Sequence, residues 1–178
     1  MTKFDVVSRF VGQDNLIPKR STEYSAGYDM VAAEDVIIPP YVDLYNNFVS
    51  LWSSGGNPQT LEQVSSMTKS SKIKPTLVST GVKVYLSNNQ YLKLVSRSSI
   101  PLKHWLICAN GEGIIDADYA DNQDNEGEIF FQMINLSPFP IKIQKGERIC
   151  QGIIQSYELT DDDNASGQRM GGFGSTNV

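Results

Sequence analysis

The sequence predicts an all-β domain, and three observations support that prediction. Short stretches rich in β-branched residues recur along the chain, turn residues separate them, and no long segment shows the helical period. Strands of this length and spacing are typical of a sandwich, a jelly roll or a barrel. The 178 residues, 40% of them hydrophobic, suffice for one domain with its own core.

The expected strands follow one another along the chain. Apolar residues alternate in 3–11, and 79–86 places Val82 and Val84 on one face. Turn residues at 87–90 and 144–147 separate the later candidates. These later strands are expected at 91–95, 128–136, 140–143 and 148–159.

Two segments interrupt the strand pattern. Residues 98–105 predict one short helix, with Ser98 or Ser99 as its N-cap and Pro101 in its first turn. Residues 39–75 are rich in Ser, Asn, Gly and Gln, and include a three-residue apolar spacing compatible with a short amphipathic helix: Leu61, Val64 and Met67. We therefore expect a single β domain over 1–164, an inserted segment at 39–75, and a flexible glycine-rich arm at 165–178.

The charge and the cysteines exclude several classes of protein. A net charge of -5 disfavours a nucleic-acid binder, which needs a basic face. No apolar run spans a bilayer and no charged-then-apolar leader opens the chain, so we expect a cytoplasmic protein without a membrane partner. Cys108 and Cys150 lie among apolar residues and are expected as buried free thiols, and with His104 they do not make a standard zinc site.

Two clusters contain residues that suit a nucleotide. Arg97, Ser98 and Ser99 offer a guanidinium, two hydroxyls and the N–H groups of a helix start to phosphate oxygens; the alternative is an ordinary capped helix. In 110–119, glycines flank a segment that can form a hairpin, whose backbone can read the edge of a base. If that segment is extended, Asp116 and Asp118 share a face, so one carboxylate can deprotonate a water while Tyr119 packs on a sugar. A solvated acidic turn is the alternative.

Two further clusters lie nearer the C-terminus. In 146–151, Arg148 and Gln151 interrupt an apolar strand, and they either face a site or finish an edge strand. Residues 169–176 are glycine-rich but lack the Lys-Ser/Thr ending of a Walker A loop. Phe173 is expected to stack on a base when this tail closes, and a plain disordered terminus is the alternative.

Taken in order, these clusters resemble the five motifs of the trimeric dUTPase family. The first motif is Ser-Ala-Gly-Tyr-Asp-Met-Val-Ala at 25–32, and the insertion at 39–75 separates it from the second. The others lie at 97–99, at 110–119 resuming at 127–129, at 146–151 and at 169–176. The resemblance implies a jelly-roll-like, distorted β-barrel that forms a homotrimer with shared active sites. It also implies magnesium-dependent hydrolysis of dUTP to dUMP and pyrophosphate, which keeps uracil out of DNA and supplies dUMP for thymidylate synthesis.

The resemblance also implies a role for each matching residue. Asp116 is expected as the general base, and Tyr119 as the ring that packs against deoxyribose and rejects a 2'-hydroxyl. Asp29 is expected near Mg²⁺ through water, since the triphosphate supplies the main metal ligands. Asn110 and the hairpin backbone at Gly113 and Ile115 are expected to bind uracil, with no room for the methyl group of thymine. The expected phosphate- and base-binding residues are Arg97, Ser98, Ser99, Gln151, Arg169, Phe173, Gly174, Ser175 and Thr176.

The chain departs from the family pattern in three places. Arg169 stands one residue closer to Phe173 than in the commonest form, which weakens its expected phosphate contact, and Asn177 replaces a frequent glycine. An added acidic loop fills 120–126, and the resemblance assigns it no catalytic role.

Two other functions are compatible with the sequence. A dCTP deaminase, alone or combined with dUTPase activity, shares the fold, and ammonia release from dCTP distinguishes it. An interaction protein is the other alternative, with 39–75 binding a regulatory protein or thickening the trimer interface. An insert that packs on its own barrel is the simpler expectation for that segment.

Overall fold

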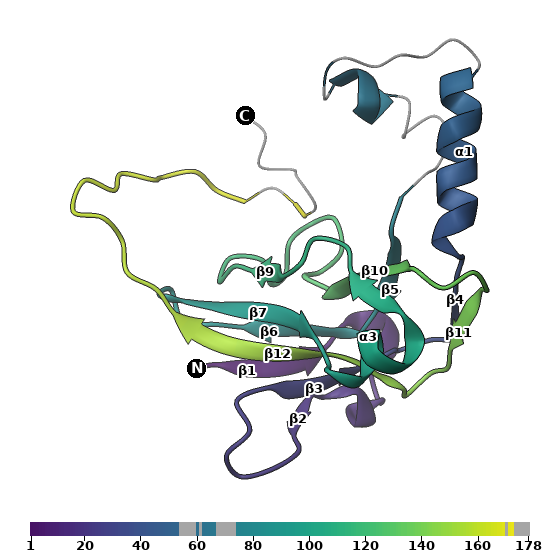
Figure 1. Cartoon of the computed structure of the whole chain (residues 1–178). Helices are drawn as coiled ribbons and strands as arrows, with labels where there is room; N and C mark the ends of the chain where they lie inside the picture. The colour runs from purple at the N-terminus through teal and green to yellow at the C-terminus, as the bar shows by residue number, and fades with distance from the viewer. Residues whose placement is uncertain (54–59, 61, 67–73, 170, 173–178) are drawn as a thin grey trace.

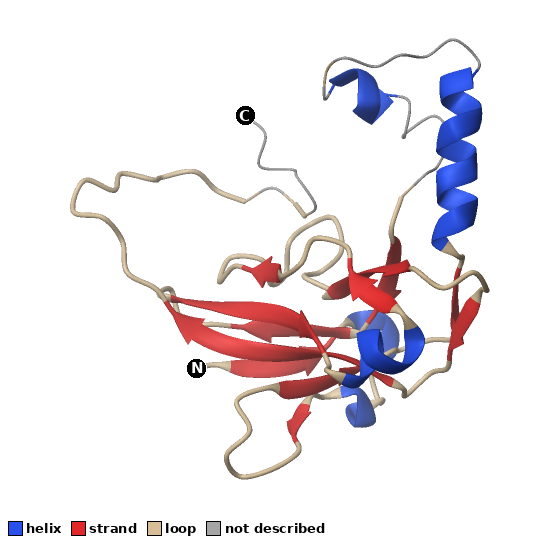
Figure 2. Ribbon diagram, in the orientation of Figure 1, coloured by secondary structure: helices blue, strands red, loops and turns tan. Residues whose placement is uncertain are grey.

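The structure is a computed structural model that describes residues 1–53, 60, 62–66, 74–169 and 171–172 (Figure 1). Strands prevail over helices in it (Figure 2), so the prediction of a mainly β chain is confirmed. The helices are α1 (Tyr41–Ser53) and α3 (Ser99–His104), with 3₁₀ turns η1 (Ser8–Phe10) and η2 (Asp14–Leu16). The strands are β1 (Lys3–Val6), β2 (Lys19–Arg20), β3 (Tyr28–Val31), β4 (Val36–Ile38), β5 (Thr76–Ser79), β6 (Val82–Tyr85), β7 (Gln90–Ser96), β8 (Leu106–Cys108), β9 (Gly113–Ile115), β10 (Phe130–Asn135), β11 (Ile141–Ile143) and β12 (Arg148–Ser156).

The named strands pair antiparallel throughout the described part of the chain. The largest sheet has five strands in the order β2-β3-β12-β7-β9, and a second sheet has the order β5-β10-β8. Two-stranded pairs β1-β6 and β11-β4 complete the arrangement. In the largest sheet, β12 is central, and its Gln151 lies opposite Asp29 on β3 and Val95 on β7. This register brings residues from three distant parts of the sequence side by side.

The core consists of the inward-facing side chains of these strands. On β10, Phe131 and Met133 are buried while their neighbours are less so, which is the period of two that a strand imposes. Leu92 and Leu94 on β7 follow the same alternation and join the same cluster. The sheets are therefore held by one apolar interior, and their polar edges carry the site.

The first strand is shorter than the sequence predicts. It was expected over 3–11, but β1 ends at Val6, and η1 carries Phe10 into the core with an exposed fraction of 5%. The amide of Phe10 donates to the carbonyl of Val7 over 2.9 Å, so the turn satisfies the backbone while it reverses the chain. Burial of one large ring in this turn overrides the alternating pattern.

The short helix after Arg97 is present as predicted. Ser98 occupies the N-cap position, but its backbone is helical and its side chain makes no capping hydrogen bond. Pro101 lies in the first turn, as expected. Trp105 ends the helix with a φ of 54° in the left-handed region, and its amide donates to the carbonyl of Pro101.

The insertion contains a helix that the sequence prediction missed. The absence of long helical segments was wrong, because α1 spans 13 residues and projects away from the strands (Figure 1). After Pro39-Pro40 the apolar residues recur at steps of three and four, a helical spacing visible in the sequence: Tyr41, Leu44, Tyr45, Phe48 and Trp52. Tyr41, Val42, Tyr45 and Val49 are exposed on α1. A regulatory partner for this segment stays a prediction.

The rest of the insertion is described only in part. Val64 lies in a helical turn at 62–66, which agrees with the expected short helix, but Leu61 and Met67 lie outside the described residues. The division into a domain at 1–164 and an arm at 165–178 likewise stays a prediction. Among the described residues, none of the helices is long and apolar enough to cross a membrane.

Candidate active site

A pocket of about 220 Å³ lies between the β8–β9 turn, strand β10 and the returning arm. Its lining is Leu94, Asn110, Gly113, Ile114, Ile115, Asp116, Tyr119, Phe130, Phe131, Gln132 and Arg169. The structure thus brings together six predicted site residues: Asn110, Gly113, Ile115, Asp116, Tyr119 and Arg169. Carboxylate, amide and guanidinium groups lie there beside apolar side chains, so the pocket offers a small molecule both polar and apolar contacts.

The turn from β8 to β9 forms one wall of this pocket. Gly111 has a φ of +73°, and its amide donates to the carbonyl of Cys108 over 3.2 Å. The next strand, β9, pairs with β7 so closely that a Cβ on Gly113 would lie 3.1 Å from the Leu94 Cβ. Glycine at 113 therefore lets the hairpin backbone approach the sheet and face the pocket.

The side chain of Asn110 is oriented by a buried thiol. Cys108 Sγ donates to Asn110 Oδ1 over 2.9 Å. Burial raises the pKa of the Cys108 thiol, so the proton that makes this contact is retained at neutral pH. The contact assigns the carbonyl oxygen of Asn110 to the thiol and leaves its NH₂ group as the donor toward a ligand.

Two carboxylates and one guanidinium meet at the mouth of the pocket. Asp116 Oδ2 accepts a hydrogen bond from Arg169 Nη2, and Asp118 Oδ1 accepts one from Arg169 Nε over 2.7 Å. The side chain of Asp116 is 53% exposed, so water reaches it, whereas that of Arg169 is 16% exposed. The segment is a turn here and not the extended strand on which a shared face was predicted, but both carboxylates reach Arg169, which neutralises part of their charge in this conformation.

The ring of Tyr119 is the floor beside these carboxylates. It is 6% exposed, and its hydroxyl donates to the carbonyl of Glu128 over 3.2 Å. The guanidinium carbon of Arg169 lies 5.7 Å from the ring centroid, and Gly172 packs against the ring edge. Tyr119 therefore offers a fixed apolar face that the arm covers on one side.

A basic cluster lies apart from the pocket, around the carboxylate of Asp29. Arg97 Nε and Gln151 Nε2 donate to its Oδ1 over 3.0 and 3.1 Å. Arg148 Nη1 and Ser21 Oγ donate to its Oδ2 over 3.2 and 2.7 Å. Burial would raise the pKa of Asp29, but these hydrogen bonds and the two arginines outweigh it and lower that pKa. Asp29 is thus an anion that holds two cations in place.

A β-bulge explains why two residues three apart reach the same carboxylate. Side chains of a regular strand alternate, so Arg148 and Gln151 would face opposite sides of β12. The register against β3 shifts between Arg148 and Cys150, and the extra residue turns both side chains toward Asp29. Gly27 adds close contact, since a Cβ there would lie 3.0 Å from the Gln151 Cβ.

The cluster borders a second cavity of about 240 Å³. Arg97, Ser99 and Arg148 line it, together with His104. Among the described residues, none lines both this cavity and the first pocket. The chain therefore presents a nucleoside-sized pocket with carboxylates and, separately, a basic surface suited to phosphate.

Sequence reasoning missed or left open part of this cluster. The sequence left two alternatives for Arg148, facing a site or finishing an edge strand. The second is wrong, because β12 lies inside the five-stranded sheet, and a site role stays a prediction. Ser21 was not predicted; its only sequence signal is that it precedes the first motif by four residues. The predicted residues Phe173, Gly174, Ser175 and Thr176 lie outside the described residues, and Arg169 contacts Asp116 and Asp118.

The described side chains do not form a metal cage. Among them, no group of three or more His, Cys, Asp or Glu could hold a metal ion. Both oxygens of Asp29 already accept hydrogen bonds, so direct coordination would displace an arginine, a serine or a glutamine. This donor set fits Mg²⁺ only as an ion whose main ligands come from a bound polyphosphate.

Comparison with known proteins identifies the family. The dUTPase family model matches residues 63–177, which include four of the five motifs. The chain is 37% identical over 175 residues to the deoxyuridine 5'-triphosphate nucleotidohydrolase of Lactococcus lactis, covering 97% of this chain and 95% of that protein. The enzyme of the same name from Zymomonas mobilis is 31% identical, covering 90% and 88%. The chain belongs to the dUTPase family.

Solved structures agree with this assignment. The crystal structure of dUTPase from Streptococcus mutans matches with a TM-score of 0.69 and 33% identity, covering 89% of this chain and 98% of that one. A mutant dUTPase from phage phi11 of S. aureus, whose structure concerns the coordination of a structural Mg(II) ion, matches with a TM-score of 0.58 and 16% identity, covering 94% and 97%. At that identity the second match supports the fold alone.

Proposed function

We propose that the chain hydrolyses dUTP to dUMP and pyrophosphate, and so keeps uracil out of DNA and supplies dUMP for thymidylate synthesis. The observation that carries the proposal is the pocket in which Asn110, Asp116 and Tyr119 meet, in a chain of the dUTPase family. Each of the three has chemistry suited to one part of the reaction: reading a base, activating water and contacting a sugar. Two buried free thiols suit the cytoplasm, where we place the enzyme.

The nucleoside part of the substrate fits the pocket walls. The backbone of Gly113 and Ile115 supplies donors and acceptors to the edge of uracil, and the amide of Asn110 adds one more. Because Gly113 packs tightly on Leu94, this wall of the pocket cannot move back to make room. This supports the exclusion of thymine, which has a methyl group at position 5. Tyr119 packs against deoxyribose and rejects a 2'-hydroxyl by contact.

Asp116 serves as the general base in this proposal. Its half-exposed carboxylate accepts a proton from water, the resulting hydroxide attacks the triphosphate, and the bond between the α and β phosphates breaks. The current partner of Asp116 is Arg169, so the guanidinium must leave the carboxylate for catalysis. The triphosphate oxygens are the competing anions, which is consistent with the expected phosphate contact of Arg169.

Phosphate binding is assigned to the basic cluster. Arg97, Ser98, Ser99 and Gln151 are the predicted contacts, and the structure adds Arg148 to the candidates. Asp29 fixes the two guanidinium groups so that they need not reorganise when the substrate arrives. Mg²⁺ bound with the triphosphate would offset its negative charge, and Asp29 would be the residue expected to hold the ion's water ligands.

A homotrimer with shared active sites completes the proposal. Within the described part of one chain, the pocket and the cavity beside the basic cluster have no lining residue in common, so a second copy is the natural source of the missing half. The arm at 165–178 then adds Arg169, Phe173, Gly174, Ser175 and Thr176 to the substrate. Sedimentation of the intact protein tests the trimer, and a monomer at assay concentrations would contradict it.

One assay series tests the activity. Pyrophosphate release is measured for dUTP, dCTP, dTTP and UTP with Mg²⁺, and ammonia release is measured for dCTP. We expect pyrophosphate from dUTP alone at a high rate. Comparable release from dTTP or UTP contradicts the assigned specificity, and ammonia from dCTP reveals the deaminase alternative.

A further inference from the structure

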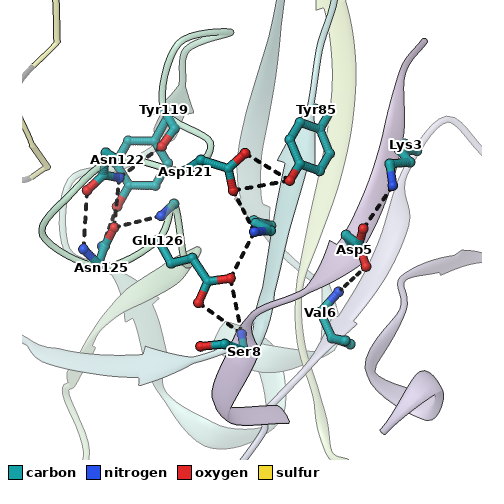
Figure 3. Close-up of polar contacts among 12 residues, drawn as sticks. Lys3, Asp5, Val6, Ser8, Tyr85, Tyr119, Asp121, Asn122, Asn125 and Glu126 are labelled. Atoms are coloured by element: carbon teal, nitrogen blue, oxygen red, sulfur yellow. Dashed lines mark hydrogen bonds and ion pairs between the residues drawn. The ribbon is translucent and has the colours of Figure 1, made fainter. Parts of the chain in front are cut away.

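The loop at 120–126 has no part in the function proposed above, yet polar contacts fill it (Figure 3). Its two ends are tied to Lys83 on β6, whose Nζ lies 2.6 Å from Asp121 Oδ1 and 2.9 Å from Glu126 Oε1. Burial disfavours the charge on Lys83, but the hydrogen bonds to Asp121 and Glu126 outweigh it and raise the pKa of Lys83. One cation from the core therefore clamps both ends of the loop.

The loop backbone is closed as tightly as its ends. Asp121 and Glu126 have φ values of 59° and 61°, and the amide of Asp121 donates to the carbonyl of Glu126 over 3.2 Å. Tyr85 and Ser8 add contacts, the hydroxyl of Tyr85 to Asp121 Oδ2 over 2.9 Å and the amide of Ser8 to Glu126 Oε2 over 2.9 Å. A left-handed backbone conformation is unfavourable for residues other than glycine, and the contacts around the two ends of the loop hold it in place.

Inside this frame, Asn125 holds the pocket tyrosine. Asn125 Nδ2 donates to the hydroxyl of Tyr119 over 2.8 Å, while its Oδ1 accepts from Asn122 Nδ2 over 2.8 Å and from the amide of Gly127 over 3.0 Å. The Tyr119 hydroxyl also donates to the carbonyl of Glu128. The Tyr119 hydroxyl therefore donates one hydrogen bond and accepts another, and these two bonds fix the hydroxyl end of the ring.

The same loop also contacts the arm. The amide of Gly172 donates to Asp124 Oδ2 over 3.2 Å. A Cβ on Gly172 would lie 3.1 Å from both Cε2 and the hydroxyl of Tyr119, so the arm passes beside the ring with little room for a side chain. Loop, ring and arm are thus in mutual contact at one point.

We propose that the loop at 120–126 positions the Tyr119 ring for substrate discrimination, with Asn125 as the positioning residue and Asp124 as the docking point of the arm. This inference rests on the proposed function, because it assigns the ring its contact with the sugar. A ring anchored at its hydroxyl cannot retreat from a ribose 2'-hydroxyl, whereas a released ring can. The added loop thereby serves the choice between deoxyribose and ribose.

The first test compares substrates in the full-length protein. We expect Asn125→Ala to lower the ratio of kcat/KM for dUTP to that for UTP about tenfold, mainly by improving UTP. Gln123→Ala, an exposed change in the same loop, is the matched control and should keep the ratio within about twofold. A folded Asn125→Ala protein with the wild-type ratio overturns the positioning role.

A double-mutant cycle shows whether Asn125 acts through the ring. Tyr119→Phe removes the hydroxyl and should lower the ratio by a similar factor, and it tests the contact even where Asn125→Ala fails to fold. The double variant should be no worse than the poorer single one, because both changes break one contact. Losses that multiply, or a Tyr119→Phe protein with the wild-type ratio, overturn the mechanism.

Arm docking is tested without any turnover. Asp124→Ala should speed trypsin cleavage after Arg169 severalfold, while Gln123→Ala should leave it unchanged; equal rates overturn the docking role. This readout separates the two proposals. A wild-type chain that releases no pyrophosphate from dUTP overturns the proposed function, whereas an active wild type with unchanged variants overturns only the inference about the loop.

Discussion

Arg97 and Asp29 form an ion pair, with Nε of Arg97 3.0 Å from Oδ1 of Asp29, at a carboxylate whose side chain is only 7% exposed. The other oxygen of Asp29 contacts Arg148. A single buried anion thus holds two guanidinium groups near each other, where they would otherwise repel. In the proposed function, the binding of the triphosphate depends on this pre-existing arrangement.

We expect Asp29→Asn to weaken both folding and substrate binding. Charged hydrogen bonds contribute about 1.5–3 kcal/mol each, so we expect a loss of about 1–3 kcal/mol in the free energy of unfolding and a KM for dUTP raised about tenfold. Urea denaturation and steady-state kinetics measure these changes. Asp43→Asn, in the exposed first turn of α1, is the control. An unchanged KM would remove Asp29 from the organisation of the phosphate site.

Asp116 and Asp118 contact the same arginine but have different predicted roles. Asp116→Asn should lower kcat about 10²–10⁴-fold, because it removes the general base, while the nucleotide still binds. Asp118→Asn removes only an arm contact and should cost much less. Calorimetric binding of dUMP shows that each variant is folded and competent. Equal losses in the two variants would argue against a proton-transfer role specific to Asp116.

Deletion of 165–178 should leave a stable trimer with weak activity. Arg169 and Gly172 cover one side of the pocket, and closure by the arm excludes water and adds donors to the substrate. Sedimentation and a pyrophosphate assay measure the two properties separately. Full activity in the truncated protein would show that the arm is dispensable.

The acid stability of the fold should depend on Glu126. Hydrogen bonds from Ser8 and Lys83 lower its pKa from 4.5 to about 2 in the folded state. Because the folded pKa lies below the unfolded one, the stabilisation is complete above about pH 4.5 and is lost as the pH falls toward about 2. Glu126→Gln should therefore flatten the pH dependence of the urea midpoint between about pH 6 and about pH 3. Glu158→Gln, an exposed change, should retain the wild-type slope.

Gly127 should tolerate no side chain, because the loop closes on it. Its φ is +79°, and a Cβ there would lie 2.6 Å from the Ala120 Cα. Gly146 has a φ of +85° with open space around it, which makes Gly146→Ala the matched control for strain alone. We expect Gly146→Ala to cost about 1 kcal/mol and Gly127→Ala about 2–4 kcal/mol in urea denaturation. Equal costs would mean that the loop adapts.

Much of the fold and of the pocket was predictable from local patterns. The strand-like stretches between turns, at 91–95 and 128–136, contain the central part of β7 and all of β10. The family motifs gave Asp116 and Tyr119, which the structure places in one pocket. A local sequence pattern does not show where a β-bulge shifts the strand register, and so does not show which face a side chain takes beyond it. The contact of Arg148 with Asp29 therefore became visible only in the structure.

Long-range contacts limited the prediction in other places. The anchor of the loop at 120–126 is Lys83, 38 residues before Asp121, and no spacing rule links the two. The core position of Phe10 ended β1 early, although the alternation continues in the sequence. By contrast, α1 was readable from its apolar spacing and was missed because the segment is otherwise polar.

The insertion joins strands that belong to different sheets, since β4 pairs with β11 and β5 pairs with β10. Neither β4 nor β5 lines the pocket or the cavity beside the basic cluster. The described ends of the insertion thus lie outside both sites, while the loop at 120–126 contacts the Tyr119 ring that lines the pocket. The two added segments are therefore under different structural constraints, because only the second is tied to a wall of the pocket.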